Sequence, residues 1–187
     1  MVAIMLAVVL LPKLSQPTEL QVKTDRLLST IAKGESRGNY NAYYGNVAND
    51  KIRFTEMPVR KVLAWQDAFV KKGSPSSAVG KYQFIKPTLQ GLIKELSIHP
   101  DVKFDAALQD RLAARLLERR GLHEYMQGKM SREEFAHNLS KEWAALPKII
   151  GSQPDQSYYA GDGLNKVQIS RSEIFSSIAT LQYQPSK

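Results

Sequence analysis

The sequence predicts a mainly α-helical (α+β) domain with a small β-hairpin or loop insertion after its first helix. Apolar residues recur at helical spacing along most of the chain, and residues that start or stop helices flank these segments. The stretch 39–50 is instead rich in Asn, Gly and Tyr, and it predicts turns with a short hairpin that is too polar for the core. A chain of 187 residues can bury a core without cross-links.

The helices are predicted from apolar periodicity and from their terminal residues. The first follows Thr24 and Asp25 as candidate caps and ends at Gly34 or Gly38. Further helices are expected over residues 58–73, 87–96, 105–120, 131–143 and 172–181. Residues 82–85 alternate in the manner of a short strand.

The N-terminal segment, residues 1–22, differs in composition from the predicted helical domain, residues 23–187. Residues 2–11 are continuously apolar, which is about half of the roughly 20 residues that a membrane-spanning helix needs. No basic residue precedes this run and no clear cleavage site follows it. An export or weak anchor segment, a truncated start and an apolar arm packed in an assembly therefore all stay open, with membrane or virion contact through residues 2–12.

The chain carries 26 Lys and Arg against 18 Asp and Glu, a formal net charge of +8. A basic surface favours a polyanionic partner such as nucleic acid, acidic lipid or the bacterial cell wall. No nucleic acid is expected, because the basic residues are spread along the chain without a stripe on one helix. The absence of cysteine excludes thiol chemistry, and three histidines without ligand spacing indicate no metal or other cofactor.

Glu35 is the most informative carboxylate of the sequence. It follows Ile31 by four residues and Leu28 by seven, so it continues the apolar face of the first helix where that helix ends. Burial and the negative end of the helix both disfavour a charged carboxylate, which predicts a raised pKa. Such a carboxyl suits a general acid, although a glutamate at a fraying helix terminus has the same pattern.

Two further blocks carry ligand-binding residue types. The block SSAVGKYQF contains Gly80, where the backbone can approach a ligand, and Gln83, whose amide suits sugar hydroxyls. The block LSKEWAALP precedes the glycine-rich SYYAGDGLNK, whose rings and amides are of the kind that line carbohydrate grooves. Each block alone is more typical of a turn or connecting loop beside core aromatics, and Trp143 is expected in the core.

Taken together, these blocks resemble the phage λ-type lysozymes, which are muralytic enzymes with a lysozyme-like fold. The resemblance spans about residues 27–166 and rests on IAKGES, SSAVGKYQF, FDAALQDRLAARLLERRGL, LSKEWAALP and SYYAGDGLNK. It implies cleavage of the MurNAc–GlcNAc β-1,4 bond of peptidoglycan, with Glu35 as the catalytic acid and Gly80, Tyr82 and Gln83 in the glycan cleft. Further substrate-binding candidates are Ser36, Tyr43, Tyr44, Tyr158 and Tyr159.

The reaction type depends on a second carboxylate. Hydrolysis needs two carboxyl groups flanking the bond, and lysozymes of the Glu-Asp-Thr type place an aspartate where this chain has Tyr44. Asp50 and Glu56 are the remaining candidates. Without them, the λ-type route uses Glu35 alone and leaves a 1,6-anhydro ring on MurNAc.

We expect a lytic transglycosylase of phage or prophage origin that acts in cell-wall lysis or penetration. Its expected place of action is the periplasm or cell wall, reached by export or aboard a virion. A hydrolytic muramidase and a non-catalytic virion or wall-binding protein of the same fold stay open as alternatives.

Overall fold

The structure is a computed structural model that describes residues 19–181, with side chains from residue 23 onward. Its helices are α1 (Glu19–Ser36), η1 (Phe54–Glu56), α2 (Val59–Lys71), α3 (Lys86–Glu95), α4 (Ala106–Arg119), α5 (Leu122–Met126), α6 (Arg132–Ser140) and α7 (Arg171–Ala179). The fold is mainly α and lysozyme-like, as the sequence predicts. Residues 2–12, through which membrane or virion contact is expected, lie outside the described residues.

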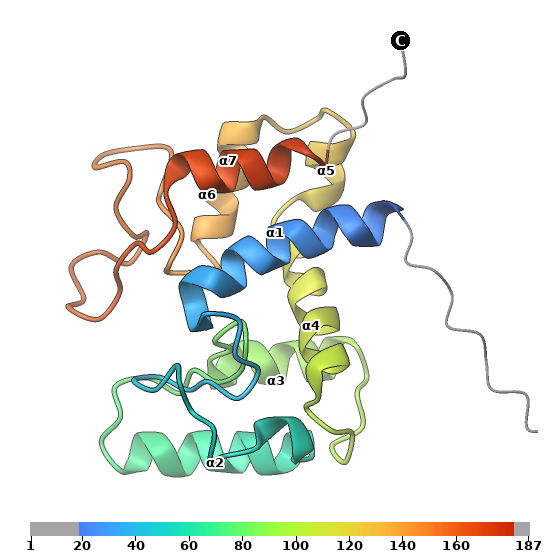
Figure 1. Ribbon diagram of the computed structural model, residues 1–187, viewed down its shortest axis with the longest axis vertical. Coiled ribbons are helices and arrows are strands. Elements are labelled where there is room, and N and C mark those ends of the chain that lie inside the picture. The colour runs from blue at the N-terminus through green and yellow to red at the C-terminus, as the bar shows by residue number, and fades with distance from the viewer. Residues whose placement is uncertain (1–18, 182–187) are drawn as a thin grey trace, which may run out of the picture.

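Figure 1 shows two groups of helices with α4 running between them. α1 contacts α4 and α7, α6 contacts α5 and α7, and α2 pairs with α3 near the other end of α4. The C-terminal end of α1, the turns after it and the long loop before α7 lie on one side of the molecule. Within residues 19–181, no helix is both long and apolar enough to cross a membrane.

A single core runs through both groups of helices. α1 contributes Leu27 and Ile31, and α4 contributes Leu112 and Leu116. The largest fully buried aromatic side chains are Tyr82, Tyr125, Phe54, Phe84, Phe104 and Phe135. Full burial of a large apolar side chain stabilises a protein by roughly 1.5–3 kcal/mol, so this core accounts for the stability of the fold. The loops on one side of the molecule are therefore not needed for the core and can carry polar residues.

Local capping residues fix the ends of two helices whose ranges the sequence predicts. Asp105 caps α4 by accepting a hydrogen bond from the Leu108 N–H at 2.9 Å, and Gly121 ends that helix with a φ of +101°. Ser131 and Glu134 form the capping box of α6. These signals are local, which explains why the sequence reveals them.

Two expectations about the helices are wrong, and one helix was not expected. Thr24 and Asp25 do not cap the first helix, because it begins at Glu19 and both residues lie inside it. The helix expected over 131–143 ends at Ser140. The short helix α5, which no strong apolar period marks, was not predicted.

The expected hairpin and strand are both turns. Residues 39–53 form turns with isolated bridges from Tyr43 to Asn46 and to Val79. Asn49 is buried there, contrary to the expectation that this stretch stays out of the core, and its side chain donates to two backbone carbonyls. Short amide side chains hydrogen-bond the backbone and so replace strand pairing.

Candidate active site

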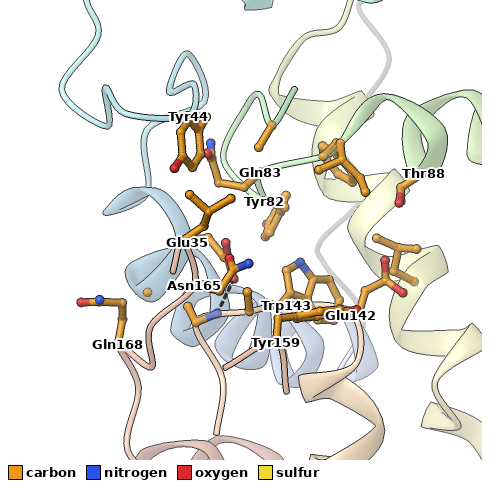
Figure 2. Close-up of a pocket in the computed structure, with 18 of the residues that line it drawn as sticks. Glu35, Tyr44, Tyr82, Gln83, Thr88, Glu142, Trp143, Tyr159, Asn165 and Gln168 are labelled. Atoms are coloured by element: carbon orange, nitrogen blue, oxygen red, sulfur yellow. Dashed lines mark hydrogen bonds between the residues drawn. The ribbon is translucent and has the colours of Figure 1, made fainter. Parts of the chain in front are cut away.

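A pocket of about 690 Å³ opens beside the end of α1. Its walls come from that helix end, from residues 44–47 and 78–88, from the end of α4 and from the segment 141–168. This volume lies within the range of sites that bind small molecules or sugars, roughly 300–1,000 Å³. Figure 2 shows that side chains from these distant segments converge on one space.

Glu35 is partly buried in the wall of this pocket, and the Ala145 N–H donates a hydrogen bond to its Oε1 at 2.9 Å. Burial raises the pKa of the carboxyl from 4.5 to about 7, and the hydrogen bond from Ala145 opposes this rise because it favours the charged form. Glu35 can therefore both hold and release a proton near neutral pH.

Gly34 allows the chain to approach Glu35 closely. A Cβ at Gly34 would lie 2.9 Å from the Cβ of Ala145 and 2.8 Å from Cγ1 of Ile169. The Ala145 carbonyl also accepts hydrogen bonds from the N–H groups of Gln168 and Ile169, at 2.9 and 3.1 Å. The segment around Ala145 is thereby held against the C-terminal end of α1, where the Ala145 N–H donates to the carboxyl of Glu35.

Gly80 begins the turn that carries the predicted glycan-binding residues, but it does not itself line the pocket. Its φ is +80°, and a Cβ there would clash with Oε1 of Gln109. Gln109 is buried, accepts from the Lys81 N–H at 2.9 Å and donates to the Tyr40 and Phe104 carbonyls. Glycine is thus required by the turn and by this buried amide.

Tyr82 and Gln83 both line the pocket, although they lie in a turn and not in the expected strand. Tyr82 is buried and its hydroxyl donates to Oδ1 of Asp110 at 2.6 Å. Gln83 has a φ of +49°, and its Nε2 donates to the Gly80 carbonyl at 2.8 Å. None of the described residues donates a hydrogen bond to the Oε1 of Gln83, so this acceptor is available to a ligand.

The four candidate tyrosines divide into two pairs. Tyr44 and Tyr159 line the pocket, and the Tyr159 hydroxyl donates to the Lys141 carbonyl at 2.6 Å. Tyr158 is exposed outside the pocket. Tyr43 lies in an aromatic cluster with Phe54, Trp65 and Phe69.

Three other candidates lie away from the pocket. Ser36 is buried, and its hydroxyl already donates to the Lys81 carbonyl at 2.6 Å. Asp50 and Glu56 are exposed and contribute no atoms to the pocket wall. The turns after α1 therefore do not carry either carboxylate to Glu35.

Sequence reasoning missed Glu142, which lies in the pocket wall and is only 12% exposed. Nη2 and Nε of Arg120 donate to its Oε2 at 2.6 and 2.9 Å. The buried Trp143 lies between Glu142 and Glu35 in the view of Figure 2. The position of Glu142 beside the WAALP block was the only available signal.

Asn165, Gln168 and Thr88 also line the pocket. Asn165 is the amide of the SYYAGDGLNK block, whereas Gln168 and Thr88 were not predicted. They line the same pocket as Gln83, with Thr88 coming from α3 and both amides from the loop before α7. Between residues 19 and 181, no group of three or more His, Asp or Glu side chains is arranged to hold a metal ion. The polar groups of this pocket instead suit a ligand rich in hydroxyls and amides.

The helical fold and the pocket beside the partly buried carboxyl of Glu35 define a lysozyme-like protein. The endolysin family model matches residues 26–169, which is most of the chain, and the chain belongs to this family. It is therefore a phage cell-wall-degrading enzyme whose substrate is peptidoglycan. The chain has no significant match among curated proteins and none among solved structures.

Proposed function

We propose that this endolysin cleaves the MurNAc–GlcNAc β-1,4 bond as a lytic transglycosylase, with Glu35 as its catalytic carboxyl. The observation that carries the proposal is the environment of Glu35, whose pKa is raised to about 7 in the wall of the pocket. The other carboxylate of the pocket, Glu142, is already held by Arg120.

In the first half of the proposed reaction, the neutral form of Glu35 donates its proton to the oxygen of the leaving GlcNAc. The bond between that oxygen and the MurNAc anomeric carbon breaks in this step. Oε1 accepts the hydrogen bond from Ala145, so Oε2 carries the transferable proton.

In the second half, the charged Glu35 accepts the proton of the MurNAc 6-hydroxyl. The 6-oxygen then bonds to the anomeric carbon and closes a 1,6-anhydro ring. No water is consumed and Glu35 regains its proton. A pKa near neutrality suits a group that must act as acid and then as base.

The polar lining of the pocket supports a glycan ligand. Gln83, Asn165 and Gln168 present amides that can hydrogen-bond sugar hydroxyls and acetamido groups. Tyr44 and Tyr159 add aromatic rings that can lie against sugar faces.

A hydrolytic muramidase is the second candidate, and Glu142 is the observation that favours it. Hydrolysis requires a second carboxyl roughly 5–10 Å from the acid, and Glu142 is the other carboxylate among the described residues of the pocket. Its ion pair with Arg120 favours a structural or binding role instead.

Mass spectrometry of the muropeptides released from purified sacculi tests the proposal. Fragments lighter by one water, without a reducing end, are expected from wild type and from Glu142→Gln, and none from Glu35→Gln. If wild type instead releases fragments with reducing ends and Glu142→Gln does not, the enzyme is a hydrolytic muramidase. Binding to sacculi without released fragments would indicate a non-catalytic wall-binding protein.

The proposed place of action is the outer side of the cytoplasmic membrane, because the wall lies there. The apolar residues 2–11 support export, or attachment to a membrane or virion. Fractionation of cells that express the full chain tests export. Recovery of the protein only from the cytoplasm would contradict it.

A further inference from the structure

A cluster of polar side chains lies behind the turn of residues 80–83. At its centre is Asp110, which belongs to α4 and is partly buried. Its Oδ1 accepts hydrogen bonds from the Tyr82 hydroxyl at 2.6 Å and from Nζ of Lys81 at 3.2 Å. Its Oδ2 accepts from the Tyr40 hydroxyl at 2.7 Å. One carboxylate therefore joins α4 to this turn and to the turns that follow α1.

Lys81 completes the cluster from the side of the turn. Its Nζ also donates to the Tyr40 hydroxyl at 2.9 Å, and it lies 4.6 and 5.1 Å from the ring centroids of Tyr40 and Tyr82. Burial and the hydrogen bond to Asp110 raise the pKa of Tyr82, so its hydroxyl keeps the proton that it donates. Because hydrogen bonds to a charged group are roughly twice as strong as neutral ones, the cluster holds Tyr82 in one orientation.

The cluster reaches the pocket through Tyr82. Asp110, Lys81 and Tyr40 contribute no atoms to the pocket wall, whereas Tyr82 and Gln83 both line it. Figure 2 shows these two residues beside one another on the wall. Since Gln83 directly follows Tyr82 in the turn, the orientation of Tyr82 also sets the position from which the open acceptor of Gln83 meets a ligand.

Two other contacts hold the backbone of the same turn. The Lys81 N–H donates to Oε1 of Gln109 at 2.9 Å, and the Ser36 hydroxyl donates to the Lys81 carbonyl at 2.6 Å. Both contacts remain when the side chain of Asp110 is changed. The Asp110 side chain is 38% exposed, and ion pairs exposed to water contribute little to stability. Asp110 therefore contributes more to the orientation of the side chains than to the stability of the fold.

We propose that Asp110 is a positioning residue, which orients Tyr82 and through it Gln83 for the glycan strand. The inference rests on the proposed function, because it requires a glycan in the pocket. Asp110 does not line the pocket, so it acts on binding through its neighbours and not on the proton transfer at Glu35. Its loss is therefore expected to raise KM and to leave kcat nearly unchanged.

Steady-state kinetics of Asp110→Ala on solubilised strands from purified sacculi test this expectation. Alanine is a good helix former, so α4 is retained, and circular dichroism verifies the fold. We expect KM to rise roughly tenfold, which corresponds to about 1.4 kcal/mol, with kcat within about twofold of wild type. Destabilisation alone would instead reduce the amount of active enzyme, which lowers the apparent kcat and leaves KM unchanged.

Tyr82→Phe tests the link between Asp110 and the pocket wall. This change removes the hydroxyl that Asp110 holds and keeps the buried ring. Because Lys81 still binds Asp110, we expect a smaller rise in KM, roughly threefold. The double variant Asp110→Ala/Tyr82→Phe is expected to have the KM of Asp110→Ala alone, since both changes break the same contact. Rises in KM that multiply in the double variant would show that Asp110 does not act through Tyr82.

Asp67→Ala is the matched control. Asp67 lies inside α2, its side chain is 48% exposed, and it pairs with Lys86 outside the pocket wall. The change removes a carboxylate from a helix and from a lysine, as Asp110→Ala does, and is expected to keep the wild-type KM.

The outcomes separate this inference from the proposed function. A wild-type KM in folded Asp110→Ala, or an equal rise of KM in Asp67→Ala, would overturn the inference while fragments are still released. Wild type that releases no fragments would contradict the proposed function, and the inference with it.

Discussion

At the level of single residues, the setting of Glu35 combines burial with one donated hydrogen bond. The helical spacing from Ile31 predicted that this carboxyl would be partly buried with a raised pKa, and the structure agrees. Burial is the main cause of the rise. The hydrogen bond from Ala145 was not predictable, because its donor lies 110 residues further along the chain.

This setting has a cost in stability that depends on pH. The pKa of Glu35 is 4.5 in the unfolded chain and about 7 in the folded protein, so the folded state binds the proton more tightly. Wild type therefore loses stability as the pH rises through this interval. Because a change of one in pKa corresponds to about 1.4 kcal/mol, the loss approaches about 3 kcal/mol above pH 7.

Glu35→Gln removes the ionisable group and is expected to remove this loss. Its melting temperature should match wild type at acidic pH and exceed it above about pH 7. Glu56→Gln makes the same chemical change at an exposed position and controls for the loss of one charge. A difference in melting temperature between wild type and Glu35→Gln that is the same at every pH would show that burial does not penalise the charged form of Glu35.

At the level of secondary-structure elements, the turn of residues 80–83 depends on glycine. Gly80→Ala is expected to destabilise the protein by about 2–4 kcal/mol, because Ala disfavours a φ of +80° and its Cβ would displace the buried Gln109. Urea denaturation measures this change in the free energy of unfolding.

Gly91→Ala is the matched control for Gly80→Ala. Gly91 lies inside α3, and a Cβ added there would have nothing within 4 Å, so alanine should favour the helix by up to about 1 kcal/mol. A Gly80→Ala protein that unfolds at the same urea concentration as wild type would contradict the role of glycine in this turn.

The elements also show where sequence reasoning succeeds. The starts of the helices expected from residues 105 and 131 were predictable, because a capping residue bonds to a residue only three positions away. The turn at Gln83 was mistaken for a strand, because alternation of buried and exposed side chains arises in both. This turn is held by the buried Gln109, which lies in α4 and accepts a hydrogen bond from the Lys81 N–H.

At the level of the whole molecule, the pocket exists because α1 and the segment 141–168 meet. The sequence blocks predicted which stretches contribute to the site. They did not predict which side chains of these stretches line the pocket and which are buried in the core. Tyr43 and Ser36 belong to buried contacts, and Glu142 enters the pocket wall. Such sorting depends on tertiary packing, which no local pattern encodes.

Gly34→Ala tests the meeting of these two segments. Its methyl group would press on Ala145 and Ile169 and move the Ala145 N–H away from Glu35. Loss of this hydrogen bond should raise the pKa of Glu35 further, because the bond favours the charged form. We expect cleavage to slow roughly ten- to a hundredfold and its decline with pH to begin at a higher pH. A wild-type pH profile would contradict this contact.

The proposed function depends above all on the carboxyl of Glu35 supplying the proton that breaks the glycan bond. It is best tested by the initial rate at which wild type and Glu35→Gln release fragments from purified sacculi, across neutral pH at constant ionic strength. We expect a wild-type rate that falls as the pH rises through about 7. We also expect a folded Gln variant that is slower by at least about a hundredfold. A folded variant that releases fragments at the wild-type rate would contradict this role of Glu35.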